Sequence, residues 1–350
     1  CWKERPDKKL SQIKVLEEKY HGQSSQLKRT AVGDLLKATK VDSAIITSLD
    51  AISWLLNLRG RDIPCLPVFY ATVIINQNGD VICFLDLKKM AKNIKSSFDS
   101  GVSFQCKSFL DKHLLSISDK IIQIDPLTIN ACLVELLQKD GVEIVESLDP
   151  ISLLKAQKNS TELLGFKACH LRDANAVINF LSWLAHNTDS KNFYDEATLS
   201  NKLESYRAND SLYQQPSFDT VSAVGSNAAM CHYNHNDSTP KLMTNNSIYL
   251  VDSGAHYLDG STDVTRTVAI GKVTNEQIKS QLVNNAEVSS APLLFSAQFK
   301  NPFIDKLLIL LLVIFWAIER VLSEIKKTKQ SSVTKSSSDS TTYQKIKRNR

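Results

Sequence analysis

Two aspartates in an apolar, hairpin-like stretch are the residues most suited to chemistry in this sequence. Asp252 and Asp263 lie on either side of a segment rich in Gly and Asp, between runs of apolar and β-branched residues, and this pattern predicts two strands joined by a turn. A turn centred between Tyr257 and Leu258 would place Asp252 directly opposite Asp263. Two ionised carboxylates with Cβ atoms about 4.5–5.5 Å apart repel each other unless a proton or cation lies between them.

A divalent metal ion would remove this repulsion. Carboxylate oxygens suit Mn²⁺, Mg²⁺ or Zn²⁺, and a bridging aspartate suits two ions about 3.5–4 Å apart. The alternative is that both aspartates flank the turn and face solvent, as strand-end aspartates commonly do. The residues alone leave both interpretations open.

Two helices that precede the hairpin are expected to support it. Helix-capping residues at 158–162 begin a long helical pattern that continues to Leu184, and a second amphipathic helix is predicted at 195–207. Helices followed by antiparallel strands indicate an α+β unit.

An α/β alternation fills residues 25–148. Asn78-Gly79 predicts a tight hairpin between the strands at 71–75 and 81–85, because both residues tolerate positive φ. The other predicted elements are helices at 25–40, 49–58 and 126–139 and strands at 43–47, 121–124 and 142–145.

Three stretches of the sequence carry more specific motifs. They are Ser217-Phe-Asp-Thr-Val-Ser-Ala-Val-Gly-Ser-Asn-Ala-Ala-Met-Cys-His-Tyr233, Val251-Asp-Ser-Gly254 and Asp259-Gly-Ser-Thr-Asp-Val-Thr-Arg-Thr267. Together they resemble the catalytic half-domain of Xaa-Pro aminopeptidases (aminopeptidase P), the pita-bread metallopeptidases of family M24. The segment Ser53-Trp-Leu-Leu-Asn-Leu-Arg-Gly60 resembles the creatinase-N-like middle domain of the same family.

The resemblance implies a chemistry. Asp252 and Asp263 would bind two divalent metal ions, Mn²⁺ or Zn²⁺, and His232 would contact the substrate and help to stabilise the tetrahedral intermediate. The substrates would be peptides with proline at the second position, and a homodimer is one assembly that the resemblance allows. The aspartate pair argues against metal-free creatinase chemistry. The large middle domain favours an aminopeptidase over a prolidase-like dipeptidase, which stays a lesser alternative.

The resemblance also implies a domain order. The predicted fold is an α/β creatinase-N-like (RNase H-like) domain, then an α+β partial pita-bread half-domain, then a helical apolar segment and a disordered tail. The predicted boundaries are a linker at 1–24, the middle domain at 25–148, the half-domain at 149–272, a divergent linker at 273–302, an apolar helix at 303–325 and a basic Ser/Thr-rich tail at 326–350.

The resemblance covers about residues 2–272, so the chain is predicted to be truncated at both ends. The second half-domain of the family normally supplies further His and Glu ligands, but no histidine follows His256 in this sequence. We therefore expect at most weak metal binding and an incomplete catalytic site. An inactive remnant and a tail-anchored binding protein are the alternatives.

Several polar residues outside the aspartate pair are expected to be structural. Arg59 and Asp62 lie in a loop at a predicted helix end. His235 lies in a polar loop and is expected to be exposed, while turn formation explains His256 and Asp259.

Charge and composition bear on the cellular compartment of the protein and on the partners that it could bind. Residues 320–350 include nine basic and two acidic side chains, so this tail carries a net charge of +7. Because the whole chain carries +5, the remainder carries about −2. The globular part therefore gives no electrostatic reason to expect nucleic-acid binding. Seven scattered cysteines without a C-x-x-C pair favour the cytoplasm.

An apolar run near the end of the sequence leaves a second localisation open. Twelve unbroken apolar residues at 307–318 are few for a span, which needs about 20, but 303–322 could insert with its charges near the ends. The protein would then be membrane-anchored with a cytoplasmic basic tail.

Overall fold

A computed structural model describes residues 11–91, 94–138, 141–188 and 194–277 of the 350-residue chain. The predicted apolar helix at 303–325 and the tail at 326–350 lie outside the described residues, as do parts of the predicted linkers at 1–24 and 273–302. Among the helices that are described, none is long and apolar enough to cross a membrane.

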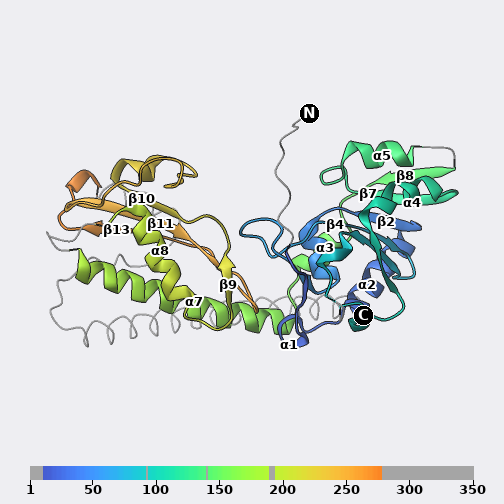
Figure 1. Ribbon diagram of the computed structural model, residues 1–350, viewed down its shortest axis with the longest axis horizontal. Coiled ribbons are helices and arrows are strands. Elements are labelled where there is room, and N and C mark those ends of the chain that lie inside the picture. The colour runs from blue at the N-terminus through green and yellow to red at the C-terminus, as the bar shows by residue number, and fades with distance from the viewer. Residues whose placement is uncertain (1–10, 92–93, 139–140, 189–193, 278–350) are drawn as a thin grey trace, which may run out of the picture. The chain divides into compact units, whose positions relative to one another are not determined.

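The first part of the chain is built on a six-stranded mixed sheet in the order β6-β5-β4-β2-β7-β8 (Figure 1). Parallel pairs join β2 to β7, β7 to β8 and β5 to β6, and antiparallel pairs join β2 to β4 and β4 to β5. The strands are β2 Ser43–Ile46, β4 Ala71–Asn76, β5 Val81–Leu85, β6 Val102–Cys106, β7 Lys120–Ile124 and β8 Val142–Glu146. The predicted hairpin is confirmed as β4–β5, with Gly79 at φ 84° in its turn.

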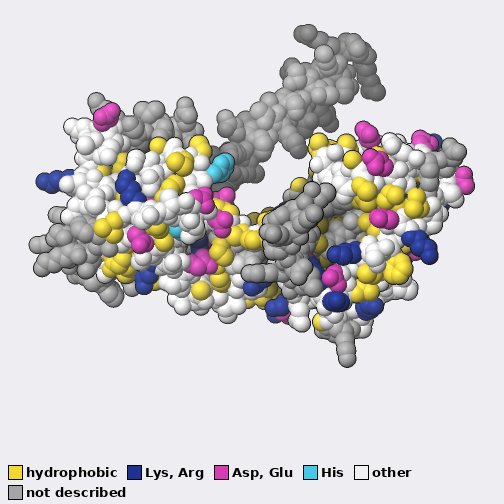
Figure 2. Space-filling view, turned by 45° about the horizontal axis from the view of Figure 1, so that its top comes forward, with side chains coloured by type: hydrophobic (Ala, Val, Ile, Leu, Met, Phe, Trp, Pro, Cys, Tyr) yellow, Lys and Arg dark blue, Asp and Glu magenta, His cyan; other side chains and the backbone are white. Residues whose placement is uncertain are grey.

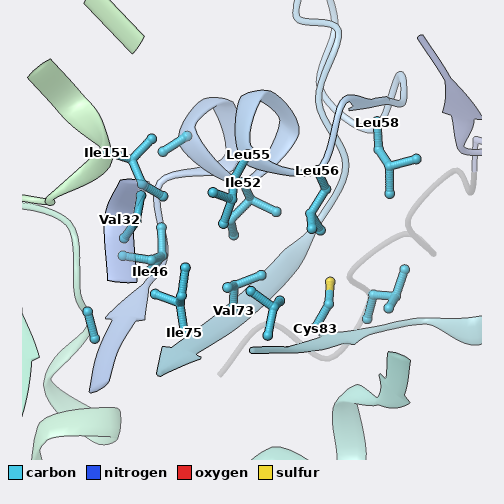
Figure 3. Close-up of a cluster of buried hydrophobic side chains, with 14 of the residues drawn as sticks. Val32, Ile46, Ile52, Leu55, Leu56, Leu58, Val73, Ile75, Cys83 and Ile151 are labelled. Atoms are coloured by element: carbon cyan, nitrogen blue, oxygen red, sulfur yellow. The ribbon is translucent and has the colours of Figure 1, made fainter. Parts of the chain in front are cut away.

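Helices cover both faces of this sheet because successive strand residues alternate between two cores. Ile46, Val73 and Ile75 point into one core with α2 (Ser25–Ala38) and α3 (Leu49–Leu55) (Figure 3). The other core gathers the alternate strand residues under α4 (Leu110–Ser116) and α5 (Ala131–Leu137), namely Ile45, Ile74, Phe84, Ile122 and Ile124. Each fully buried aliphatic side chain contributes about 1.5–3 kcal/mol.

Two of the predicted helices are shorter than expected. The helix predicted at 126–139 begins only at Ala131, because Asp125 accepts a hydrogen bond from Leu127 N and holds Pro126 in a turn, and Asn130 then caps the helix. The helix predicted at 49–58 ends at Leu55, ahead of Asn57 at φ 51°.

Short elements complete this part of the chain. They are β1 Lys14–Val15, β3 Leu58–Arg59, α1 Glu18–His21, α6 Ile151–Ala156 and the 3₁₀ turns η1 Leu87–Lys89, η2 Lys95–Ser97 and η3 Lys107–Phe109. Strand β6 and helix α4 were not predicted.

The second part of the chain places a small sheet on two helices. Helix α7 (Ser160–Asn187) begins with a capping box between Asn159 and Glu162, and α8 (Glu196–Arg207) is capped by Asp195, so both predicted helices are confirmed. The sheet has the order β10-β11-β13, and a separate ribbon pairs β9 with β12. The bounds are β9 Tyr213–Pro216, β10 Val221–Val224, η4 Gly225–Ala229, β11 Ser247–Ser253, β12 Ala255–Tyr257 and β13 Val264–Ile270.

One face of this sheet is packed on the helices, the opposite face carries Asp252, and Asp263 directly precedes β13. Tyr249 and Val251 of β11 are buried with Phe180 of α7 and Leu199 of α8. Because strand residues alternate, Asp252 points away from this core.

Candidate metal site

The hairpin that carries the two aspartates exists, but its register differs from the prediction. Strands β11 and β13 pair so that Asp252 faces Thr265 and not Asp263. The turn is therefore centred between Leu258 and Asp259, one residue later than predicted. This register puts Gly260 at the last position of the turn, where glycine is favoured.

The corrected register still leaves both aspartates on one side of the hairpin. Asp263 lies one residue before β13, two residues from Thr265, the partner of Asp252. The hydrogen bond from Thr262 N to Ala255 O continues the pairing of β11 and β13 past Asp263, so the alternation of side chains places Asp263 on the side of Thr265. Thr265 Oγ1 donates a hydrogen bond of 2.7 Å to Asp252 Oδ1 and so fixes the orientation of that carboxylate. Asp252 is half-buried and Asp263 is exposed. In the part of the chain that the structure describes, neither carboxylate forms an ion pair.

A glycine between the aspartates allows their strands to approach closely. A Cβ atom on Gly254 would lie 2.0 Å from Thr262 O and 2.3 Å from Ser217 Oγ, which no real side chain tolerates. Ser217 Oγ also donates to Thr262 O at 3.0 Å. The backbone that precedes Asp263 is thus held against Gly254, two residues after Asp252.

The donor set fits part of a divalent metal site. Two carboxylates on one face suit hard or borderline cations. The described residues contain no group of three or more His, Cys, Asp and Glu side chains that could hold an ion. They do not form a complete dinuclear centre by themselves.

His232 lies in the connection between β10 and β11, with an exposed side chain and φ 55°. Within the described ranges it makes no hydrogen bond to either aspartate, so the structure does not bring the three predicted site residues into contact. Its neighbour Tyr233 is buried.

A buried glutamate that no local sequence pattern indicates holds this connection in place. Glu196 has no exposed surface. Its carboxylate accepts hydrogen bonds from Val224 N at the end of β10, at 2.7 Å, and from three donors on the connection, namely Asn227 Nδ2 at 2.9 Å, Tyr233 OH at 2.7 Å and Lys241 N at 2.8 Å. Burial and the hydrogen bond to Glu196 raise the pKa of Tyr233, so its hydroxyl stays a donor. The sequence showed Glu196 only as a first-turn helix residue, which gave no sign of these contacts.

His235 and His256 differ from their predicted roles. His235 is buried and not exposed. His256 lies in strand β12 and not in the turn, and its imidazole contacts Cys65 of the first part of the chain. Arg59 is structural as expected, since it donates to Ser53 O at 2.8 Å, and burial lowers its pKa to about 10.

The tip of the hairpin is docked on α7. Arg172 pairs with Asp259 of the turn at 2.5 Å and with Asp210 at 3.0 Å. A Cβ atom on Gly165 would lie 2.3 Å from Asp259 O, so helix and turn are in close contact. Asp259 therefore anchors the turn to a helix in addition to shaping it.

Family models match nearly all of the described chain. Residues 4–162 match the Creatinase/Prolidase N-terminal domain, and residues 165–289 match metallopeptidase family M24. The chain therefore belongs to the M24 metallopeptidases that carry a creatinase/prolidase N-terminal domain. Within that class its relatives are the Xaa-Pro aminopeptidases, as the motifs predicted.

Individual relatives support this relationship. The chain is 37% identical over 281 residues to Xaa-Pro aminopeptidase 1 of Dictyostelium discoideum, covering 79% of this chain and 44% of that protein. It is 32% identical over 311 residues to Xaa-Pro aminopeptidase ApepP of Drosophila melanogaster, covering 87% of this chain and 50% of that protein. The chain spans about half the length of the curated relatives it matches.

Solved structures agree with the fold. X-prolyl aminopeptidase from Caenorhabditis elegans, described as a cytosolic enzyme with a di-nuclear active site, superposes with a TM-score of 0.74 at 32% identity, over 79% of this chain and 46% of that one. The prolidase from Pyrococcus horikoshii superposes with a TM-score of 0.56 at 18% identity, over 74% of this chain and 70% of that one, and shows the fold alone.

Proposed function

We propose that this chain carries the aspartate half of a dinuclear metal site of the Xaa-Pro aminopeptidase type, directed at peptides with proline at the second position. The observation that carries the proposal is the hairpin register, which brings Asp252 within two residues of the position opposite Asp263, while neither carboxylate forms an ion pair in the described structure. The Xaa-Pro aminopeptidases among the relatives, and the di-nuclear active site of the Caenorhabditis elegans enzyme, supply the reaction class.

The roles follow from the positions of the side chains. Asp252, oriented by Thr265, and Asp263 would hold Mn²⁺ or Zn²⁺, and such ions lower the pKa of a bound water and polarise the scissile carbonyl. His232, on the connection that Glu196 fixes, would donate to the substrate. A hydrogen-bonding group in that position contributes about 10²–10⁴-fold at most.

The site supplied by this chain is incomplete in our proposal. Two carboxylates leave most coordination positions to water, and imidazole ligands are not available after His256 in the sequence. Ligands that fix the geometry of a metal site set much of its affinity. We therefore propose weak metal binding.

The direct test is Mn²⁺ affinity. Asp252→Asn and Asp263→Asn should each raise the dissociation constant for Mn²⁺, measured by the loss of the free-ion signal in electron paramagnetic resonance, by about 10-fold or more. Asp111→Asn, at an exposed position on α4, is the matched control and should bind as the wild type does. Equal affinities in all four proteins would rule out the aspartate site.

We also propose a cytosolic location, supported by the cytosolic nature of the Caenorhabditis elegans enzyme. Lys and Arg side chains are interspersed with Asp and Glu on the face seen in Figure 2. The membrane anchor predicted at 303–322 lies outside the described residues, and a homodimer stays a prediction.

A further inference from the structure

One loop of the first part of the chain is attached to β9 and β12, next to the hairpin that carries the candidate metal site. This loop, Arg61–Cys65, follows β3 and reaches toward β9 (Figure 1). Arg61 donates to Gln214 O at 2.8 Å, and Cys65 Sγ lies 3.7 Å from Asp219 Oδ1. The loop is itself fixed, because Asp62 accepts from Tyr70 N at 2.7 Å and forms a buried ion pair with Lys89.

His256 makes the third and most central of these attachments. Its Nε2 lies 2.9 Å from Cys65 O and its Nδ1 lies 2.5 Å from Ser261 Oγ. A carbonyl oxygen can only accept, so Nε2 carries the proton and donates to Cys65, and Nδ1 then accepts from the Ser261 hydroxyl. Both ring nitrogens therefore form a hydrogen bond, Nε2 as the donor and Nδ1 as the acceptor.

The surroundings favour this neutral form. Burial lowers the pKa of His256, and the nearby Arg59 guanidinium lowers it further, against the opposing effect of the Cys65 carbonyl. An imidazole that is neutral at pH 7 provides one donor and one acceptor, as the two contacts require. The backbone at Cys65, which carries the accepting carbonyl, has φ 59°, a conformation that few non-glycine residues adopt.

His256 and Ser261 face each other in the part of the hairpin between Asp252 and Asp263. His256 lies on β12, four residues after Asp252, and Ser261 lies opposite it, two residues before Asp263. The imidazole thus links both strands of the hairpin to a loop of the other domain. The two contacts therefore lie on the stretch of hairpin that connects the two aspartates, beside the backbone hydrogen bonds from Tyr257 N to Gly260 O and from Thr262 N to Ala255 O.

We propose that His256 is a positioning residue that acts through Ser261 and Cys65 to set the spacing of Asp252 and Asp263. This inference rests on the proposed function, because it assigns His256 a part in metal binding at that site. Histidine is suited to the task because its two nitrogens lie at a fixed separation in a rigid ring.

The chain offers a matched set of variants for the test. In His256→Gln the amide nitrogen occupies the position of Nε2 and retains a donor to Cys65. In His256→Asn the amide oxygen occupies the position of Nδ1 and retains an acceptor for Ser261. Ser261→Ala removes one contact without changing the histidine, and His256→Ala removes both. His170→Ala is the control, because the hydrogen bonds of the exposed His170 ring to described residues stay within its own helix, with Phe166 O at 2.7 Å and Cys169 Sγ at 3.6 Å.

Two readouts are measured on the full chain. Hydrogen exchange of the amides of Tyr257 and Thr262, which bond across the hairpin to Gly260 O and Ala255 O, should accelerate in Ser261→Ala and more so in His256→Ala. The dissociation constant for Mn²⁺ should rise by about 10-fold in His256→Ala, the lower end of the usual effect of losing an outer-shell partner, and by less in the Gln and Asn variants. The control should change neither readout.

The outcomes separate this inference from the proposed function. Unchanged exchange in His256→Ala and Ser261→Ala would overturn the positioning role. Faster exchange with unchanged Mn²⁺ affinity, while Asp252→Asn and Asp263→Asn lose affinity, would also overturn it and leave a structural contact. If the two aspartate variants bind Mn²⁺ as the wild type does, the proposed metal site fails, and the exchange rates alone then decide whether His256 holds the hairpin.

Discussion

At the scale of single residues, burial decides which charged groups are available for function. Asp252 and Asp263 face outward, whereas Glu196 is buried under four hydrogen bonds and can only position its loop. Asp149, next to the start of α6, is a buried carboxyl group without a full set of hydrogen bonds to described residues. It is 5% exposed, its Oδ2 has no hydrogen-bond partner among the described residues, and Asp125 lies beside it.

Asp149 should make stability depend on pH. Burial, with a smaller effect of Asp125, raises its pKa to about 6. The folded state therefore binds the proton more tightly than the unfolded state, and stability is lost as pH rises from about 4 through 6. The loss above pH 7 is at most about 3 kcal/mol by linkage.

Replacing the Asp149 carboxylate with a neutral amide should remove this loss of stability at neutral pH. Asp149→Asn retains the acceptor for Ile151 N and should increase the free energy of unfolding in urea by about 1–3 kcal/mol at pH 7.5, but not at pH 4. Asp111→Asn removes a carboxylate from the first turn of α4 and should not increase the free energy of unfolding at either pH. A gain of equal size at both values would show that Asp149 does not titrate as the structure indicates.

At the scale of elements, the close contact at Gly254 should be the most sensitive point of the hairpin. Gly254→Ala would force its methyl group into the backbone of Thr262, and an overpacked site of this kind costs about 1–3 kcal/mol. We expect a lower unfolding midpoint and faster hydrogen exchange at Thr262. Gly101→Ala, whose methyl group would lie nearest to side-chain atoms of Arg29, Asp80 and Asp99, should leave exchange at Thr262 unchanged. Normal exchange in Gly254→Ala would contradict the close approach.

Elements with strong local signals could be predicted from the sequence. The β4–β5 hairpin follows from Asn78-Gly79, and α7 follows from its capping box. The hairpin of the aspartates was predicted with the wrong pairing, because the position of Gly260 in the turn decides between registers that bury the same residues. Strand β6 and the buried state of Glu196 and His235 depend on contacts between distant segments, which local patterns do not contain.

At the scale of the whole molecule, the activity that we propose needs metal ligands beyond the aspartate pair and His232. The chain supplies two carboxylates and His232, so we expect negligible hydrolysis of an Xaa-Pro peptide even with added Mn²⁺. Chromatographic detection of the released N-terminal residue measures this hydrolysis. Robust turnover that is lost in both Asp252→Ala and Asp263→Ala would show that the site is complete, whereas turnover retained in both variants would indicate a contaminating enzyme.

The most direct measurement of the central claim is the position of a bound ion. Crystals of the full chain soaked in Mn²⁺ and measured near the manganese absorption edge should show an anomalous peak at coordination distance from the carboxylates of Asp252 and Asp263. A peak at other residues only, or none while both carboxylates face solvent, would contradict the assignment of this hairpin as the metal-binding half of the site.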